Sequence, residues 1–166
     1  MFKNKRNLFV CVITMILVLI VSGGYYLYEK ITTYNGVWDI NWGFDVPKPH
    51  KIIVVFERSM VQDGDAYIIA DYNKKQIDKI KSKSFWKKID DSNSLWNVET
   101  LIYKFKYDIV NSNAFDKDKG HFKKMFSDYP VIFSKGDLYF YKRENGNYFI
   151  AILNVDNQRL YTMEWY

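Results

Sequence analysis

The fold is decided by residues 137–165, which read DLYFYKRENGNYFIAILNVDNQRLYTMEW. Asn145-Gly146 is the strongest short-range hairpin signal, because both residues tolerate the positive φ angles of a tight turn. Asp156-Asn157 marks a second turn, and the runs between the turns are rich in aromatic and β-branched residues. We predict a three-strand antiparallel meander with strands at Asp137–Arg143, Asn147–Val155 and Gln158–Trp165.

Another hairpin precedes the meander. Ile52–Glu57 and Ala66–Tyr72 are β-branched apolar runs, and the turn-forming QDGD at residues 62–65 lies between them. Several aromatic residues of the predicted strands recur with period 2, which is typical of side chains that pack on a sheet. We place five of them in the core: Tyr139, Tyr141, Phe149, Tyr161 and Trp165.

Helices are expected between the two sets of strands. Asn73 and Gln76 have the spacing of a capping box, so a helix begins there and buries Ile77 and Ile80. Ser84 is a candidate cap for a short turn. A further helical turn is expected at His121–Phe126.

Residues 95–107 fit two patterns. Leu95, Val98 and Ile102 have helical spacing, whereas Leu101, Tyr103 and Tyr107 alternate as in a strand. Ser94 offers a cap, which favours the helix. Together these elements predict an α+β domain in which two or three helices pack on an antiparallel sheet.

The N-terminal region predicts a membrane anchor. Leu8–Tyr28 comprises 21 residues without a charge or a proline, and 21 helical residues extend roughly 30 Å, the thickness of the hydrocarbon core. Lys3, Lys5 and Arg6 precede it, and this excess of positive charge predicts a cytoplasmic N-terminus.

We therefore divide the chain into a basic cytoplasmic flank (1–7), a transmembrane helix (8–28), a stalk and linker (29–50) and an extracellular α+β domain (51–166). We expect the protein in the cell membrane, where its N-terminal helix contacts the lipid bilayer. Signal-peptide cleavage after Gly24 remains the alternative, because Ser22-Gly23-Gly24 resembles a small-residue cleavage site.

The net charge of +5 is distributed unevenly along the chain. Three positive charges precede the anchor, and residues 29–166 carry 21 basic and 19 acidic side chains, a net charge of +2. Residues 74–88 contain seven lysines and only Asp78 as an acid, a net charge of +6. This segment is a candidate site for a protein or an anionic envelope partner. We expect no nucleic-acid partner, because the segment has no binding motif and is predicted to lie outside the cell.

Few residues suit nucleophilic or general acid–base chemistry. Cys11 lies in the predicted membrane span, and a single cysteine excludes an internal disulfide and a cysteine-based zinc site. His50 lies in a proline-bracketed linker and His121 in a lysine-rich turn. Neither has an obvious partner for a catalytic triad.

Two acidic clusters are candidate sources of metal ligands. Asp63-Gly64-Asp65, with Asp71 at the end of the following strand, could offer oxygen ligands to Ca²⁺, but Asp and Gly are also ordinary turn residues. Asp116-x-Asp118-x-Gly120 lacks the glycine and glutamate positions of an EF-hand. We predict no catalytic, cofactor-binding or metal site.

Four segments of the chain form a recognisable series in this order: VQDGDAYIIADY (61–72), SFWKKI (84–89), YPVIFSKGDLYFYKRE (129–144) and NYFIAILNVDNQRLYTMEWY (147–166). Together they resemble parts of small, uncharacterised membrane-anchored or exported proteins of Firmicutes. The resemblance implies the same topology and an α+β layout, and it implies no activity.

The leading functional hypothesis is a non-enzymatic interaction module at the cell surface, with an envelope accessory or immunity-like role. The first alternative is a hydrolase of wall glycan or peptide that uses Asp63, Asp65 or His121. The second is an extracytoplasmic sensor of a small ligand.

Overall fold

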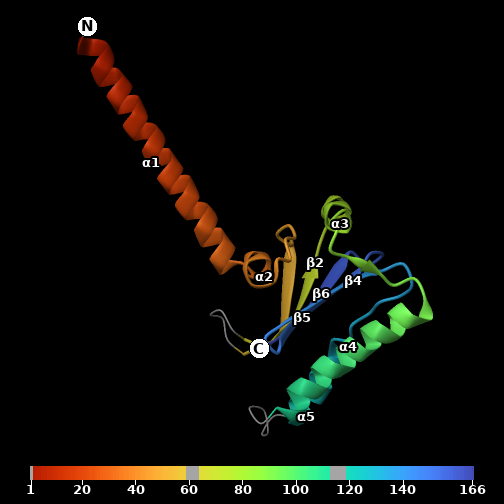
Figure 1. Cartoon of the computed structure of the whole chain (residues 1–166). Helices are drawn as coiled ribbons and strands as arrows, with labels where there is room; N and C mark the ends of the chain where they lie inside the picture. The colour runs from red at the N-terminus through yellow and green to blue at the C-terminus, as the bar shows by residue number, and fades with distance from the viewer. Residues whose placement is uncertain (1, 59–63, 113–118) are drawn as a thin grey trace. The chain divides into compact units, whose positions relative to one another are not determined.

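The computed structural model describes residues 2–58, 64–112 and 119–166 (Figure 1). The chain divides into two compact units, one up to Val46 and one from Pro47 onward. Each unit is described by itself below.

The first unit contains two helices, α1 (Phe2–Thr32) and α2 (Tyr34–Trp42). Within α1, the 24 residues Phe9–Thr32 form a helix that is long and apolar enough to cross a membrane. The side chains of residues 9–28 are exposed to the surroundings, as the side chains of a helix in lipid are.

Helix α2 occupies part of the range that the sequence analysis assigns to a stalk and linker. Gly36 lets α2 approach the backbone of α1, since a Cβ atom at this position would lie 2.1 Å from the carbonyl oxygen of Lys30. Gly43 ends the helix with φ 67°, a left-handed conformation that glycine adopts without strain. Lys30 and Asp39 form an ion pair that joins the two helices. The short aromatic sequence of α2 has no clear helical period, so the sequence alone does not predict this helix.

The second unit is an α+β domain with a six-stranded antiparallel sheet in the order β1-β2-β6-β5-β4-β3. The predicted fold class is confirmed, including the C-terminal meander of three strands. The elements are β1 (Lys51–Glu57), β2 (Ala66–Asp71), α3 (Lys74–Lys81), β3 (Lys87–Lys88), α4 (Ser92–Asn111), α5 (Lys119–Asp128), β4 (Leu138–Glu144), β5 (Asn147–Asn154) and β6 (Arg159–Trp165).

The turn between β4 and β5 forms as its sequence predicts. Asn145 has φ 51° and Gly146 has φ 92°, so both residues adopt the positive φ of a two-residue hairpin turn. Glu144 pairs with Asn147 directly across the turn. A non-local pairing connects the predicted β1–β2 hairpin to the meander, because β2 pairs with β6 and Ile68 lies opposite Thr162.

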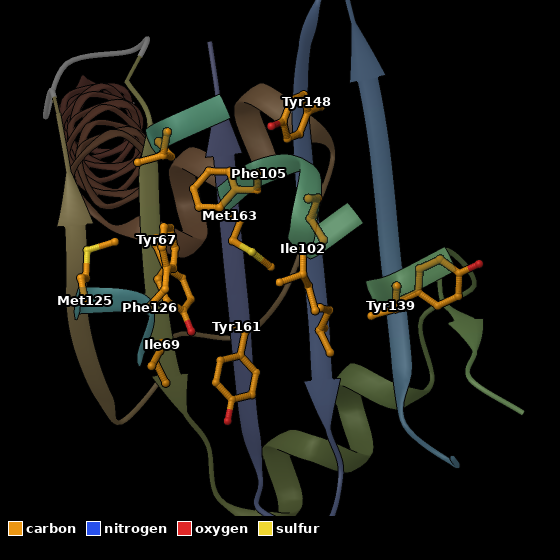
Figure 2. Close-up of a cluster of buried hydrophobic side chains, with 14 of the residues drawn as sticks. Tyr67, Ile69, Ile102, Phe105, Met125, Phe126, Tyr139, Tyr148, Tyr161 and Met163 are labelled. Carbon is orange, nitrogen blue, oxygen red and sulfur yellow. The ribbon is translucent and has the colours of Figure 1, made fainter. Parts of the chain in front are cut away.

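One face of the sheet packs against α4 and α5, and the core lies between them (Figure 2). Tyr67 and Phe126 stack with their ring centroids 5.9 Å apart, and Phe105 meets Phe126 edge-on at 6.0 Å. Of the five predicted core aromatics, Tyr139, Phe149 and Tyr161 are buried, while Tyr141 and Trp165 are partly buried.

Residues 95–107 are helical, so the strand alternative is wrong and the helix prediction is confirmed. The cap differs from the one predicted. Asp91 is the N-cap, and Ser94 is the third helical residue, whose side chain completes the capping box. The two-residue strand β3, which pairs with β4, was not predicted because its only residues are Lys87 and Lys88.

Candidate functional site

Asp65 and Asp71, the described members of the acidic cluster considered in the sequence, do not converge on one site. Asp65 precedes β2 and Asp71 ends it, so they lie about 20 Å apart at roughly 3.3 Å per residue. Asp65 is buried, accepts a hydrogen bond from the backbone N–H of Tyr166 at 3.0 Å and lies 3.1 Å from the guanidinium of Arg58. Asp71 forms a two-point ion pair with Arg159, at 2.7 and 3.2 Å, on the neighbouring strand.

Two of the remaining candidates have side chains that the structure describes, His50 and Cys11. His50 is exposed, and its backbone N–H donates to the carbonyl oxygen of Asp71. His121 lies in α5, and its side chain is outside the described part of the structure. Cys11 is a free thiol in α1. Asp63, Asp116 and Asp118 lie outside the described residues. Within residues 2–58, 64–112 and 119–166, no three metal-ligating side chains gather into a cluster.

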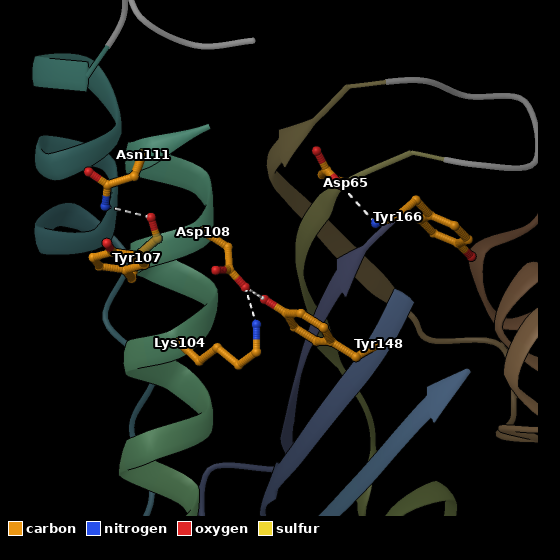
Figure 3. A network of polar contacts seen from close by, with 7 residues as sticks. All are labelled: Asp65, Lys104, Tyr107, Asp108, Asn111, Tyr148 and Tyr166. Atoms are coloured by element: carbon orange, nitrogen blue, oxygen red, sulfur yellow. Dashed lines mark hydrogen bonds and ion pairs between the residues drawn. The ribbon is translucent and has the colours of Figure 1, made fainter. Parts of the chain in front are cut away.

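A polar network joins α4 to the sheet (Figure 3). The hydroxyl of Tyr148, on β5, donates to the Asp108 carboxylate at 2.5 Å, and Lys104 forms an ion pair with the same carboxylate one helical turn away. The Lys104 ammonium also lies 4.4 Å from the centre of the Tyr148 ring. The sequence offered no signal for this network, because Asp108 and Tyr148 are 40 residues apart.

The electrostatics of the network suit a structural contact. Burial raises the pKa of the Tyr148 phenol, and the hydrogen bond to Asp108 raises this pKa further, so the phenol remains a neutral donor. Burial also raises the pKa of Asp65, against the opposing effects of the Tyr166 N–H and Arg58. The carboxylates of Asp108 and Asp65 both bind groups of their own domain. They hold α4 against β5 and hold the start of β2 against the end of β6.

The strongest concentration of charge is the lysine segment, which we define as the six exposed lysines of residues 74–88. Four lie on α3 and two form β3. None of the six forms an ion pair within the part of the chain that the structure describes. Its members are Lys74, Lys75, Lys79, Lys81, Lys87 and Lys88.

Local hydrogen bonds fix the backbone that carries the lysine segment. The predicted capping box forms, with the Asn73 side chain accepting from the Gln76 N–H at 2.9 Å. The Gln76 amide also donates to the Lys48 carbonyl oxygen at 2.7 Å. Past the helix, the indole N–H of Trp86 donates to the carbonyl oxygen of Ile80 at 2.7 Å. Ile77 and Ile80 are buried, so the lysines project from a fixed backbone.

The positions of some lysines are unfavourable for the isolated helix. Lys74 and Lys75 lie in the first turn of α3, where the helix dipole favours acidic residues, and this turn contains none. Lys75 and Lys79 are four residues apart, a spacing at which like charges repel on a helix. An anion bound at this segment would relieve both repulsions.

No protein-family model, no curated protein and no solved structure matches this chain.

Proposed function

We propose that the protein is a single-pass membrane protein that presents a non-enzymatic interaction domain outside the cell, and that its lysine segment binds an anionic partner of the envelope. The observation that supports the partner is the group of six exposed lysines without an ion-pair partner in the described residues. The apolar helix and the basic residues before it support the anchor and a cytoplasmic N-terminus. We also propose kinship with the exported Firmicutes proteins that its segments resemble.

The anionic groups in question are phosphates, either of lipid headgroups or of a surface polymer. A lysine near such a surface contributes about 1 kcal/mol. Three lysines together would then account for about 3 kcal/mol, or roughly a hundredfold in affinity. The position of Asp65, which is buried and bound to Tyr166 and Arg58, favours the interaction module over a hydrolase that uses this residue.

The first experiment tests the anchor and its orientation. A reporter fused after Tyr166 should be active only outside the cytoplasm, and the intact chain should remain in the membrane fraction with its first 24 residues attached. Reporter activity in the cytoplasm would contradict the orientation. A soluble product that begins after Gly24 would contradict the anchor.

The second experiment tests the anionic partner with the full chain in nanodiscs of neutral lipid, using a poly(glycerol phosphate) polymer as the probe. Replacing Lys75, Lys79 and Lys81 with glutamine should weaken binding about a hundredfold. The matched control replaces three exposed lysines elsewhere, Lys51, Lys124 and Lys135. Equal losses of polymer affinity in the two triple variants would mean that only the net charge matters, and this would contradict the proposal.

The source of the phosphate is distinguished in a further arm. Nanodiscs that contain anionic lipid should compete with the polymer if the lysine segment docks on headgroups. Unchanged polymer binding in anionic nanodiscs would assign the segment to the polymer.

A further inference from the structure

Helix α4 carries a row of exposed aromatic residues on the face opposite its core residues. We define the α4 stripe as Trp96, Thr100, Tyr103 and Tyr107. The exposed fractions of its three aromatic residues are 64%, 68% and 55% in chain order. The rings of Tyr103 and Tyr107 lie with centroids 6.3 Å apart. The other face of α4 is buried through Val98, Ile102, Phe105 and Ile109, so folding of the domain leaves the stripe uncovered.

The stripe is also poor in charge. Its own four residues are uncharged, the exposed neighbours Asn93, Asn97 and Asn111 carry amides, and charged residues stand only at its margins. Aromatic enrichment with depletion of charged residues is the composition of a protein–protein interface core. A partner that covers this face therefore loses little charge hydration and buries large rings.

The spacing of the stripe favours a second copy of this chain as the partner. Its members are separated by four, three and four residues, a series that is the same in both directions. We propose that the α4 stripe packs antiparallel against the α4 stripe of a second copy of this chain. Trp96 then lies opposite the partner's Tyr107, and the small Thr100 lies opposite the partner's Tyr103. Alternation of three and four residues is the spacing of helix pairs that pack knobs into holes.

Charge complementarity supports the antiparallel direction. Glu99 and Lys106 lie seven residues apart, so they occupy the same margin of the stripe. In the antiparallel pair, Glu99 of each copy approaches Lys106 of the other. Glu99 is exposed and has no ion-pair partner among the described residues of its own chain.

The area available is sufficient for a weak and specific dimer. The exposed fractions leave roughly 100–150 Å² accessible on each aromatic side chain. Six rings from two copies supply roughly 600–900 Å², and Thr100 with the flanking asparagines brings the total to about 1,000 Å², the lower limit for a specific interface. Anchoring in one membrane would raise the local concentration of the copies. Only this last step depends on the proposed anchor.

Cross-linking of the full chain tests the dimer and its direction. Cys11→Ala supplies a cysteine-free background, because the chain has one cysteine. Asn93→Cys and Asn111→Cys, both at exposed positions beside the stripe, are then made in separately tagged copies. Two copies of position 93 would lie about 27 Å apart in the antiparallel pair, at 1.5 Å per residue, whereas position 93 would face position 111. A short bismaleimide spans packed helices, whose axes lie about 8–10 Å apart.

We expect cross-linked dimer when the two variants are co-expressed, and at least tenfold less when either variant is expressed alone. Tyr103→Lys should reduce the mixed product at least tenfold, while the exposed control Asp78→Lys on α3 should leave it unchanged. Far-ultraviolet circular dichroism of each purified variant checks that it is folded. The proposal is overturned by equal cross-linking of the single variants, by absence of the mixed product, or by a folded Tyr103→Lys variant that still cross-links. The reporter fusion after Tyr166 tests the anchor separately.

Discussion

Helices α3 and α4 begin in the same way and differ on their outer faces. Each starts with a capping box, Asn73 with Gln76 and Asp91 with Ser94, and each buries an apolar inner face. The outer face of α3 is lysine-rich, whereas that of α4 carries an uncharged aromatic stripe with charged residues only at its margins. Two copies of α3 would repel each other, whereas the proposed dimer pairs two copies of α4. The inner face and the cap thus specify each helix, and the outer face is left for a partner.

The largest effect should separate the two faces of α4. Phe105→Ala removes a fully buried ring from the core and should lower the free energy of unfolding by about 3–5 kcal/mol. Tyr103→Ala, two residues earlier on the exposed face, should change it by no more than about 0.5 kcal/mol. Urea unfolding of the full chain in detergent measures both. Similar losses in the two variants would mean that the stripe is part of the core.

A smaller effect should come from the polar contact that α4 makes with the sheet. Tyr148→Phe removes the hydroxyl that donates to Asp108, and a hydrogen bond to a charged group is worth about 1.5–3 kcal/mol. Thermal unfolding measures the loss. Tyr139→Phe is the matched control, because the Tyr139 hydroxyl makes no hydrogen bond in the described residues. The contact would be energetically unimportant if both variants unfolded at the same temperature.

The cap of α3 should contribute less again. Asn73→Ala removes the side chain that accepts from the Gln76 N–H and should lower the free energy of unfolding by about 1 kcal/mol. Ser84→Ala, at an exposed position past the helix, serves as the control. Because the cap also orients α3, the variant should bind the anionic polymer more weakly. If Asn73→Ala were destabilised but kept full affinity for the polymer, the cap would have no role in binding.

The smallest effect distinguishes the two caps by pH. The Asp91 carboxylate accepts the backbone N–H and the hydroxyl of Ser94, and these bonds lower its pKa. A lowered pKa in the folded state means that the stabilisation is present above the ordinary carboxyl pKa of about 4 and is lost as the pH falls through the folded-state value. The amide of Asn73 does not titrate in this range.

We therefore expect Asp91→Asn to lose less stability than the native chain as the pH is lowered, as measured by urea unfolding from neutral to acid pH. Asn73→Asp should add a similar dependence to α3. An acid response identical in the native chain and Asp91→Asn would show that the Asp91 cap contributes nothing to it.

Local signals in the sequence predicted much of the fold. The Asn145-Gly146 turn and the Asn73–Gln76 cap depend on neighbouring residues, and both form as predicted. The pairing of β2 with β6 could not be predicted in the same way, because it joins residues about 90 positions apart. Strand β3 could not be predicted either, because lysine has a low strand propensity and Lys87 and Lys88 become a strand only by pairing with β4.

The candidate sites divide along the same line. The lysine segment is contiguous, so composition alone located it. The contact of Asp108 with Tyr148 required the fold, and the α4 stripe required knowing which aromatic side chains remain exposed. Tyr103 and Tyr107 fitted a strand as well as a helix in the sequence, so their common face became visible only once the helix was established.

The pairing of β2 with β6 also orders events during synthesis. Ile68 lies opposite Thr162, so one edge of the β1–β2 hairpin stays unpaired until the ribosome has made 94 further residues. The hairpin alone is marginally stable, and late non-local pairing slows folding. A nascent chain that remains unfolded for this long can be threaded through a translocation channel without first being unfolded. Under the proposed topology, the sheet would assemble only after its strands had reached the far side of the membrane.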